Sequence, residues 1–563
     1  MKEKIDTGGV SPAFSPDAKP GMEREVEEHS KEIAKGTFWG FLGSGAFKLI
    51  SFAYAIYVAH VVSQNDIGAF SLSIGLMGLF LAWKSFGMPL SLTRYVPYYE
   101  SRGEWGKARS ILKWTYIINV VSGVILTAAV WLSAGWVGGI YGNPALADAL
   151  CFTAFFLLLD NIFSTNTSFL QSRSDIRMMQ FAINMQNLFK LLFTILLFSL
   201  YGATLYTLSA AFVLSYLAAV LISFRDVRAN LVKIKEGEGS ISPHELLHEI
   251  IPFGLMLTAI SVLWTIIAYA DRVVLGYFVS PDRLAIYAFA AAPLALNIMV
   301  FPGVVGGIFL PAISRLIGKG DMGHVRSAMA TAQRWILFIT LPFAVVMVAF
   351  ASEMLSVFYG KDYAPGRGAT VFLCIGLMFS VISYVVQLAL AGMRLIALEL
   401  RIAFAVFFSN VLLCLLLIPP YGIEGAAAAS ALSFAFSGFL FLHYGKTMIG
   451  FSTSPSIYRL LAIGIVVCCL LILAKPAIEG IAELLPNFGG PELAIYISKA
   501  EYLLLLGFAV AASLVAFAAL AILLRCFEQE DVAMMRKAAK RAFVPERLIA
   551  LAEKILLAGV EKK

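Results

Sequence analysis

The chain has 563 residues, of which 60% are hydrophobic and only 14% charged, and its formal net charge is +7. Soluble domains carry about 25% charged residues, so this composition, with a mean hydropathy of +0.82, excludes a soluble fold. The apolar runs are continuous and about 20 residues long, whereas a membrane β-barrel alternates over segments of about ten. The composition therefore predicts an all-α polytopic membrane protein, in which positive charge marks cytoplasmic loops rather than a nucleic-acid partner.

Residues 1–35 precede the first apolar run and are rich in Pro, Gly and charge, as in the stretch TGGVSPAFSPDAKPG. Such a composition cannot bury enough apolar surface to fold alone. We expect a cytoplasmic N-terminal tail that is partly disordered.

Fourteen membrane spans are predicted from the apolar runs that follow. They cover residues 36–60, 69–88, 114–137, 149–170, 181–200, 205–224, 250–270, 285–308, 335–351, 369–391, 402–418, 425–444, 457–474 and 502–524.

Lysines and arginines gather in alternate loops, which predicts the orientation of the chain. One side carries Arg102, Lys107 and Arg109 after the second span, and its later loops are similarly basic. The first three loops of the other side, near Ser63, Asn143 and Tyr201, have no Lys or Arg. Both termini are therefore expected in the cytoplasm, with the spans in the cell membrane.

Three landmarks recur along the chain at a nearly constant separation. The octet that starts at Arg102 (RGEWGKAR) and the octet that starts at Lys319 (KGDMGHVR) share a basic-Gly-acidic-x-Gly-basic-x-Arg pattern. Tyr-Gly pairs begin at 141 and 201 in the first half, and at 359 and 421 in the second. The recurrence predicts two copies of a six-helix unit. Because six spans return the chain to its starting side, the copies have parallel topology and can rock about a central cavity.

The predicted organisation divides the chain after the N-terminal tail into five parts. These are a first six-helix lobe (36–225), a cytoplasmic linker (226–249), a second six-helix lobe (250–446), two additional transmembrane helices (447–525) and a cytoplasmic, amphipathic basic tail (526–563).

Ionisable residues deep in the spans are candidates for substrate binding, because each costs about 2.5–3.5 kcal/mol at the bilayer centre unless it faces water or a partner. In the first half these are Lys48, Lys84, Asp160 and Lys190. Asp160 can instead pair with a lysine and hold helices together, and Lys84 can reach a lipid headgroup. With two deep lysines against one deep carboxylate, the surplus positive charge suits an anionic group such as phosphate.

In the second half, Asp271 and Arg272 are adjacent at the predicted outer end of the seventh span. Snorkelling to a headgroup is the alternative role for Arg272. Asn297 lies in the middle of the eighth span, where it can donate a hydrogen bond to a substrate or support helix packing. The six histidines are scattered, the six cysteines lie in or beside apolar spans without metal-ligand spacing, and there is no P-loop motif. We therefore expect no catalysis, no cofactor and no metal site.

Several stretches resemble the polysaccharide-exporter, or Wzx-type, oligosaccharide flippases of the multidrug/oligosaccharidyl-lipid/polysaccharide superfamily. They are Gly36-Thr37-Phe38-Trp39-Gly40, Ile67-Gly68-Ala69-Phe70-Ser71-Leu72, Leu92-Thr93-Arg94-Tyr95 with the Arg102-Gly103-Glu104 loop, and Asp271-Arg272-Val273-Val274-Leu275-Gly276. The resemblance covers residues 36–446.

The resemblance implies a flippase that moves a polyprenyl-phosphate- or pyrophosphate-linked oligosaccharide from the cytoplasmic to the outer leaflet. It also implies membrane lipids, a coupling ion (H⁺ or Na⁺) and glycan-assembly proteins as partners. Lys48 occupies the kind of first-helix position where related flippases carry a basic residue. The eighth span has Asn297 and no arginine, which departs from the peptidoglycan-precursor flippases and argues against that substrate.

Two alternatives remain. A cation-coupled multidrug exporter of the same superfamily tends to carry an acidic residue in its first or seventh helix. Here the first span has Lys48, the seventh has only the terminal Asp271, and Asp160 is a further candidate proton site. The other alternative is a membrane scaffold without a transport cycle, against which the repeat and the deep charges argue.

Overall fold

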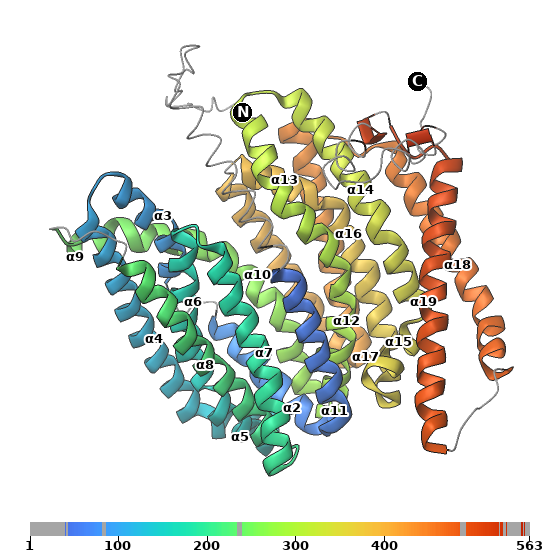
Figure 1. The fold of residues 1–563 in the computed structure, drawn as a ribbon, viewed down its shortest axis with the longest axis horizontal. Helices are drawn as coiled ribbons and strands as arrows, with labels where there is room; N and C mark the ends of the chain where they lie inside the picture. Colours follow the sequence, from blue (N-terminus) through green and yellow to red (C-terminus); the bar gives the residue numbers. More distant parts are fainter. Residues whose placement is uncertain are drawn as a thin grey trace.

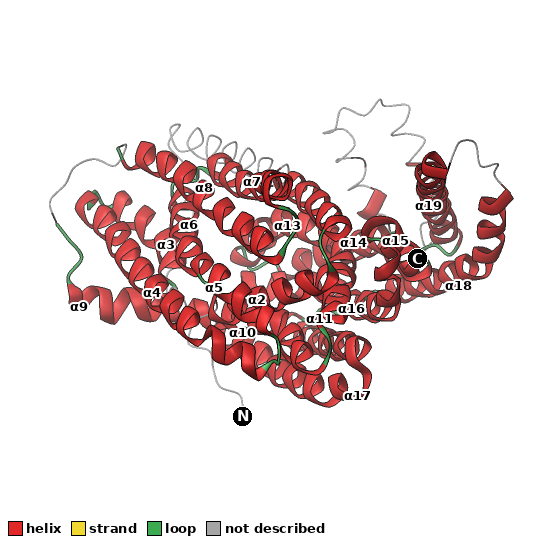
Figure 2. Cartoon of the chain, turned by 90° about the horizontal axis from the view of Figure 1, so that it is seen from below, coloured by secondary structure: helices red, strands yellow, loops and turns green. Residues whose placement is uncertain are grey.

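A computed structural model of the chain describes residues 43–81, 86–232, 239–393, 395–484 and 491–528, together with 40, 530–532, 536, 553, 554 and 557. These parts form helices joined by short loops (Figures 1 and 2), which confirms the predicted all-α class. Three predicted segments lie wholly or partly outside the described residues: the N-terminal tail (1–35), residues 233–238 of the linker, and most of the basic C-terminal tail.

The first half consists of eight helices. They are Gly43–Val61, α2 (Gln64–Leu81), α3 (Met88–Ser101), α4 (Trp105–Ile140), α5 (Pro144–Thr153), α6 (Phe155–Ser172), α7 (Ile176–Tyr201) and α8 (Leu205–Leu231).

The second half repeats this order with more interruptions. It contains α9 (Pro243–Glu245), η1 (Leu246–Ile250), α10 (Ile251–Phe278), α11 (Pro281–Ala285), η2 (Ile286–Ala291), α12 (Ala292–Leu296), η3 (Asn297–Met299), α13 (Val300–Gly318), α14 (Met322–Ala349), α15 (Ala351–Tyr359), η4 (Lys361–Gly366), α16 (Arg367–Gly392), α17 (Ile396–Tyr444) and η5 (Gly445–Ile449). The additional pair is α18 (Pro455–Leu484) and α19 (Pro491–Leu523).

Eleven helices in the described residues are long and apolar enough to cross a membrane, so the predicted count of fourteen is not confirmed. One of the eleven, Ile396–Ile449, contains two helices that meet at Gly422, whose φ of 56° and ψ of −127° are not helical. α2 covers the predicted second span (69–88) as far as Leu81, and α3 begins at the last residue of that span, Met88. The seventh span also differs, because α10 continues beyond the predicted end at Ala270 to Phe278.

Helix starts follow from local capping in the sequence. Asn143 accepts a hydrogen bond from the backbone of Leu146 at the start of α5, where Pro144 fits the first helical position. Thr204 and Thr207 form a reciprocal capping box at the start of α8. These local signals fix the loops of the first half within one or two residues.

The repeat is visible in the backbone itself. Gly103 and Gly320, 217 residues apart, have φ values of +75° and +73°, a left-handed conformation that glycine adopts without steric cost. The turns around them share the same backbone hydrogen bonds: Gly103 donates to the carbonyl of Glu100, as Gly320 donates to that of Ile317. The two octets thus form the same helix-ending turn before α4 and α14.

The two halves contact each other at the end whose loops carry few Lys and Arg, which we call the closed end; the opposite end, with the octet loops, is the basic end. They also meet toward the basic end, where a Cβ added to Gly87 would lie 2.1 Å from the carbonyl oxygen of Gly254 and the Arg94 guanidinium carbon lies 4.0 Å from the centre of the Phe253 ring. At the closed end a Cβ added to Gly68 of α2 would lie 1.9 Å from the carbonyl oxygen of Pro281, so only glycine permits this approach. The rings of Phe52 and Phe358 are 5.0 Å apart, and the Tyr141 hydroxyl donates to the carbonyl of Val273 at 3.2 Å.

The additional helices α18 and α19 lie beside the second half, on the side away from the first (Figures 1 and 2). An ion pair of 2.6 Å joins Lys475 of α18 to Glu353 of α15. The chain after α19 returns to α14, where Asp531 accepts from the Arg334 guanidinium at 2.9 Å. Within the part of the chain that the structure describes, these contacts attach the additional pair to the second half.

Candidate functional site

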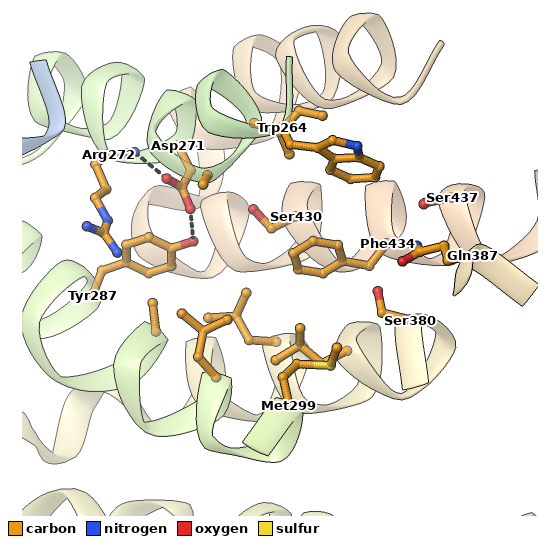
Figure 3. A pocket seen from close by; sticks show the side chains of 16 residues that line it. Trp264, Asp271, Arg272, Tyr287, Met299, Ser380, Gln387, Ser430, Phe434 and Ser437 are labelled. Carbon is orange, nitrogen blue, oxygen red and sulfur yellow. Dashed lines mark hydrogen bonds between the residues drawn. The ribbon is translucent and has the colours of Figure 1, made fainter. Parts of the chain in front are cut away.

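A cavity of about 470 Å³ lies within the second half, between α10, the η2–α12–η3 segment, α16 and α17 (Figure 3). Apolar side chains, among them Trp264, Met299 and Phe434, form much of its wall. The polar side chains that line it are Asp271, Arg272, Tyr287, Ser380, Gln387, Ser430 and Ser437. A largely apolar cavity with a few convergent polar groups is the usual form of a small-ligand site.

Asp271 is the buried acid of this cavity, with 7% of its surface exposed. The Tyr287 hydroxyl donates to its Oδ2 at 2.6 Å, and the Arg272 backbone N–H donates to its Oδ1 at 2.7 Å (Figure 3). Tyr287 belongs to the π-helical turn η2, and such turns shift the side chains that follow them relative to a regular helix. Because its carboxyl group is hydrogen-bonded, Asp271 is accommodated within α10, which continues past the predicted boundary at Ala270 to Phe278.

Arg272 is the next residue of α10 and therefore points about 100° away around the helix axis. Its guanidinium carbon lies 5.4 Å from the centre of the Tyr269 ring, and a Cβ on Gly75 of α2 would lie 3.4 Å from the Arg272 Cβ. Among the described residues, its buried Nε has no hydrogen-bond partner. Arg272 thus places a cation where the second half meets the first.

A second polar cluster, in the first half, surrounds Lys190 of α7. Its ammonium donates to Asn187 Oδ1 at 3.2 Å and lies 4.4 Å from the centre of the Tyr54 ring. Ser51 donates to the same Asn187 oxygen at 3.1 Å. Within the described residues no carboxylate lies at ion-pair distance from Lys190.

The two clusters occupy equivalent positions of the repeat. The loops Val62-Ser63 and Val279-Ser280 precede α2 and α11 at the same offset of 217 residues, which aligns Tyr54 with Asp271. Helices α7 and the first part of α17 start 220 residues apart, which aligns Lys190 with Asn410. The acid of the second half thus stands where the first half has Tyr54, and the cation of the first half stands where the second half has Asn410.

The remaining predicted residues are dispersed. Lys48 is exposed on the helix Gly43–Val61, and Asp160 is half-buried on α6. The Asn297 amide donates to the carbonyls of Pro293 and Leu294 at 3.1 and 3.2 Å, so it supports the irregular turn of its own helix. Lys84 lies outside the described residues. Of the seven predicted residues, only Asp271 and Arg272 line the cavity.

Sequence reasoning missed the partners of Asp271, most directly Tyr287 and Ser430. A signal was available for some of them: Ser430 and Ser437 are seven residues apart, a spacing that places both on one face of a helix. Gln387 is likewise an isolated amide in an apolar span. Tyr287 carried no such signal, because its orientation depends on the π-helical turn. In the described residues, no group of three or more His, Cys, Asp or Glu could hold a metal ion.

Comparison with known proteins places these features in a family context. The family described as polysaccharide biosynthesis protein matches residues 33–317, just over half of the chain. An uncharacterized membrane protein of Methanocaldococcus jannaschii, MJ1068, is 22% identical over 425 residues, which cover 72% of this chain and 82% of the relative. The probable low-salt glycan biosynthesis flippase Agl15 of Haloferax volcanii is 21% identical over 182 residues, which cover 32% of this chain and 38% of the relative.

Solved structures share the fold. The lipid II flippase MurJ in an inward closed conformation superposes with a TM-score of 0.60 at 16% identity, covering 84% of this chain and 98% of MurJ. An inward-facing multidrug resistance transporter of the MATE family gives a TM-score of 0.58 at 14% identity, covering 72% and 94%. At these identities the likeness establishes the fold, which glycan flippases and drug exporters have in common.

Proposed function

This chain belongs to the polysaccharide biosynthesis protein family, and we propose that it is a flippase for a polyprenyl-phosphate- or pyrophosphate-linked oligosaccharide. The family match over residues 33–317, which confirms the resemblance identified in the sequence, is the observation that carries this proposal. The substrate would move from the cytoplasmic to the outer leaflet of the cell membrane, with both termini of the chain in the cytoplasm.

The contacts between the halves support an alternating-access cycle. We assign the two lobes to residues 36–225 and 250–446. Gly68 against Pro281 and Phe52 against Phe358 join them at the closed end, while the basic end faces the cytoplasm in the proposed orientation. A rocking motion that separates these contacts would open the outer side.

We assign the anionic part of the substrate to the cations between the halves. Arg272 lies where the second half meets the first, and its Nε has no hydrogen-bond partner among the described residues. Lys190 has no carboxylate at ion-pair distance among the same residues. Lys48 is exposed. Guanidinium and ammonium groups are the usual ligands of phosphate. The isoprenoid tail would remain in the bilayer.

We further assign the coupling ion, H⁺ or Na⁺, to Asp271. This carboxylate is buried, lines the cavity and accepts the Tyr287 hydroxyl, so binding of a cation would change its hydrogen bonds and the shape of the adjoining η2 turn. Asp160, half-buried on α6, is the second acid to be considered.

The test is transbilayer movement of a fluorescent polyprenyl-pyrophosphate-linked sugar in proteoliposomes. The wild type is expected to move the lipid, and Lys190→Ala and Lys48→Ala to slow it while remaining folded. Failure of the wild type to move lipid, together with export of cationic dyes down a Na⁺ or H⁺ gradient, would instead identify a multidrug exporter, the other function that the fold supports.

A further inference from the structure

The cavity of the second half has two ends that differ in chemistry, as Figure 3 shows. One end holds the acid Asp271 and its hydrogen-bond partners. Trp264 precedes Asp271 by seven residues on α10, which places it on the same face of the helix and about 10 Å closer to the basic end. This other end, which we call the neutral part of the cavity, is formed by Trp264 of α10, Ser380 and Gln387 of α16, and Phe434 and Ser437 of α17.

The neutral part contains hydrogen-bonding groups that the protein itself does not use. Among the described residues, no side-chain hydrogen bond is formed by Trp264, Ser380, Gln387 or Ser437. Ser437 is only 2% exposed, so the cavity is the space that its hydroxyl faces. Polar groups that are buried without a partner cost free energy, and their presence in membrane-spanning helices therefore points to a ligand that hydrogen-bonds to them.

We propose that the neutral part of the cavity binds a sugar ring of the lipid-linked substrate. A sugar ring carries hydroxyl groups around its edge, each of which can donate and accept, and C–H groups on its faces. Serine hydroxyls and a glutamine amide also donate and accept, and the indole N–H donates. The rings of Trp264 and Phe434 supply the flat apolar surface that the C–H faces require. The inference rests on the proposed function and names the part of the substrate that this cavity holds.

The charges of the cavity favour a sugar over other ligands. Its charged lining residues are Asp271 and Arg272, which have opposite signs and lie at the other end. A cationic drug would be attracted by one of them and repelled by the other, and the same holds for a free anion. An isoprenoid chain would cover the amide and the hydroxyls without giving them a partner, which is costly. An uncharged, hydroxylated ring meets neither penalty.

Arg272 connects the cavity with the boundary between the halves. It lines the cavity, and a Cβ on Gly75 of α2 would lie 3.4 Å from its Cβ. A phosphate bound by Arg272, as proposed above, would therefore lie beside the cavity, and the sugar attached to that phosphate could enter it. The volume of about 470 Å³ is within the range of roughly 300–1,000 Å³ for small-ligand pockets. It has room for a small part of a glycan, so the remaining sugars would stay outside.

The test measures how much affinity the sugar adds to the lipid. The full-length protein is kept in a polyoxyethylene detergent, which has no sugar headgroup, and binding is followed by native mass spectrometry. The ligands are farnesyl pyrophosphate and its conjugates with glucose, galactose and N-acetylglucosamine. The readout is the ratio of the Kd for farnesyl pyrophosphate to the Kd for each conjugate, because the lipid and the pyrophosphate are common to both.

The wild type is expected to bind at least one conjugate about tenfold more tightly than farnesyl pyrophosphate, as a few net hydrogen bonds provide. Gln387→Leu and Trp264→Leu should each bring this ratio close to one. Their matched controls, Gln171→Leu and Trp136→Leu, change exposed residues of the first half and should keep the wild-type ratio. Ser437→Ala is a milder change that should lower the ratio about threefold, and it provides the test if a larger substitution prevents folding.

Three results would overturn the inference. One is a ratio near one for the wild type with all three sugars. Another is a wild-type ratio in the folded Gln387→Leu, Trp264→Leu and Ser437→Ala variants. The third is an equal loss of affinity for farnesyl pyrophosphate and its conjugates in these variants, which would assign the cavity to the lipid or the pyrophosphate.

The measurement does not depend on transport, so the sugar site and the proposed function can fail separately. A wild type that shows the sugar-dependent ratio but moves no lipid would support the site and contradict the flippase. A wild type that moves lipid equally well with and without a sugar, and shows no such ratio, would support lipid movement and reject the site.

Discussion

The two halves of the molecule share a backbone and differ in the charge at one equivalent position. In the first half Tyr54 packs under the ammonium of Lys190, whereas in the second half the position of Tyr54 is occupied by Asp271, which accepts the Tyr287 hydroxyl. The helix order and the left-handed turns at Gly103 and Gly320 are the same. A repeated scaffold can thus hold a buried acid in one half where the other half holds an aromatic ring beside a cation.

The two halves also differ in the ion pairs that attach other parts of the chain to them. On α14 the Arg334 side chain is 2% exposed and forms ion pairs with Asp531 and Glu528 of the segment after α19. The equivalent residue of α4, 217 positions earlier, is Ile117, which is 40% exposed. The second half with α18 and α19 is therefore the more tightly braced of the two, and the first half has the freer surface for movement.

The largest expected effect comes from removing the ion pair between Asp531 and Arg334. Asp531→Ala leaves the Arg334 charge without its fully buried partner and should destabilise the second half by about 3 kcal/mol. Thermal unfolding in detergent measures the loss. The matched control is Glu530→Ala in the same segment, which removes an exposed acid that accepts hydrogen bonds from Ser327 and Thr331 of α14 but has no ion pair with Arg334, and it should change stability by about 1 kcal/mol. Equal effects of the two variants would contradict the assignment of a buried ion pair.

Asp271→Asn tests the acid of the second half. The amide can still accept the Tyr287 hydroxyl but carries no charge, so gradient-driven transport should fall about thirtyfold, corresponding to the about 2 kcal/mol typical of interactions with a charged group. Binding of the glycolipid should remain. Asp148→Asn is the control, because the Asp148 carboxylate accepts from the Tyr206 hydroxyl at 2.8 Å in an exposed setting. If Asp271→Asn transports at the wild-type rate, Asp271 does not bind the coupling ion.

Lys190→Met tests the cation of the first half. Methionine has a similar length and is apolar, so the helices should pack while the interaction with an anionic substrate is lost; we expect about tenfold slower lipid movement. Flipping assays with a neutral polyprenol-linked sugar provide the comparison, since that substrate should be affected less. A variant as active as the wild type would indicate that Arg272, rather than Lys190, binds the anionic group.

The smallest effect is expected for Tyr54→Leu, which removes the aromatic face beneath Lys190. Cation–π contacts contribute about 0.5–1 kcal/mol in partly exposed settings, so transport should fall about threefold. Tyr54→Phe keeps the ring and should preserve most of the activity in the same assay. A loss in Tyr54→Phe equal to that in Tyr54→Leu would show that the hydroxyl matters more than the ring.

The sequence alone was sufficient for the features that depend on local pattern. Continuous apolar runs predicted membrane helices because a bilayer requires every backbone group to be bonded within the helix. The octets at Arg102 and Lys319 predicted the repeat, and the structure has the same turn at both. The motifs from Gly36 to Gly276 predicted the family, which the family match confirms.

Only the tertiary structure decided which polar residues meet. The predicted end of the seventh span at Ala270 was wrong, because hydrophobicity does not register that Asp271 gains a partner in Tyr287 from another helix. For the same reason the sequence left open whether Asn297 contacts a substrate or supports helix packing, and its amide donates to the carbonyl of Pro293 in its own helix. The sequence also did not show that the Lys190 ammonium lies beside the Tyr54 ring. Composition and spacing set the helices and their order, whereas the environment of each charge depends on residues far away in the chain.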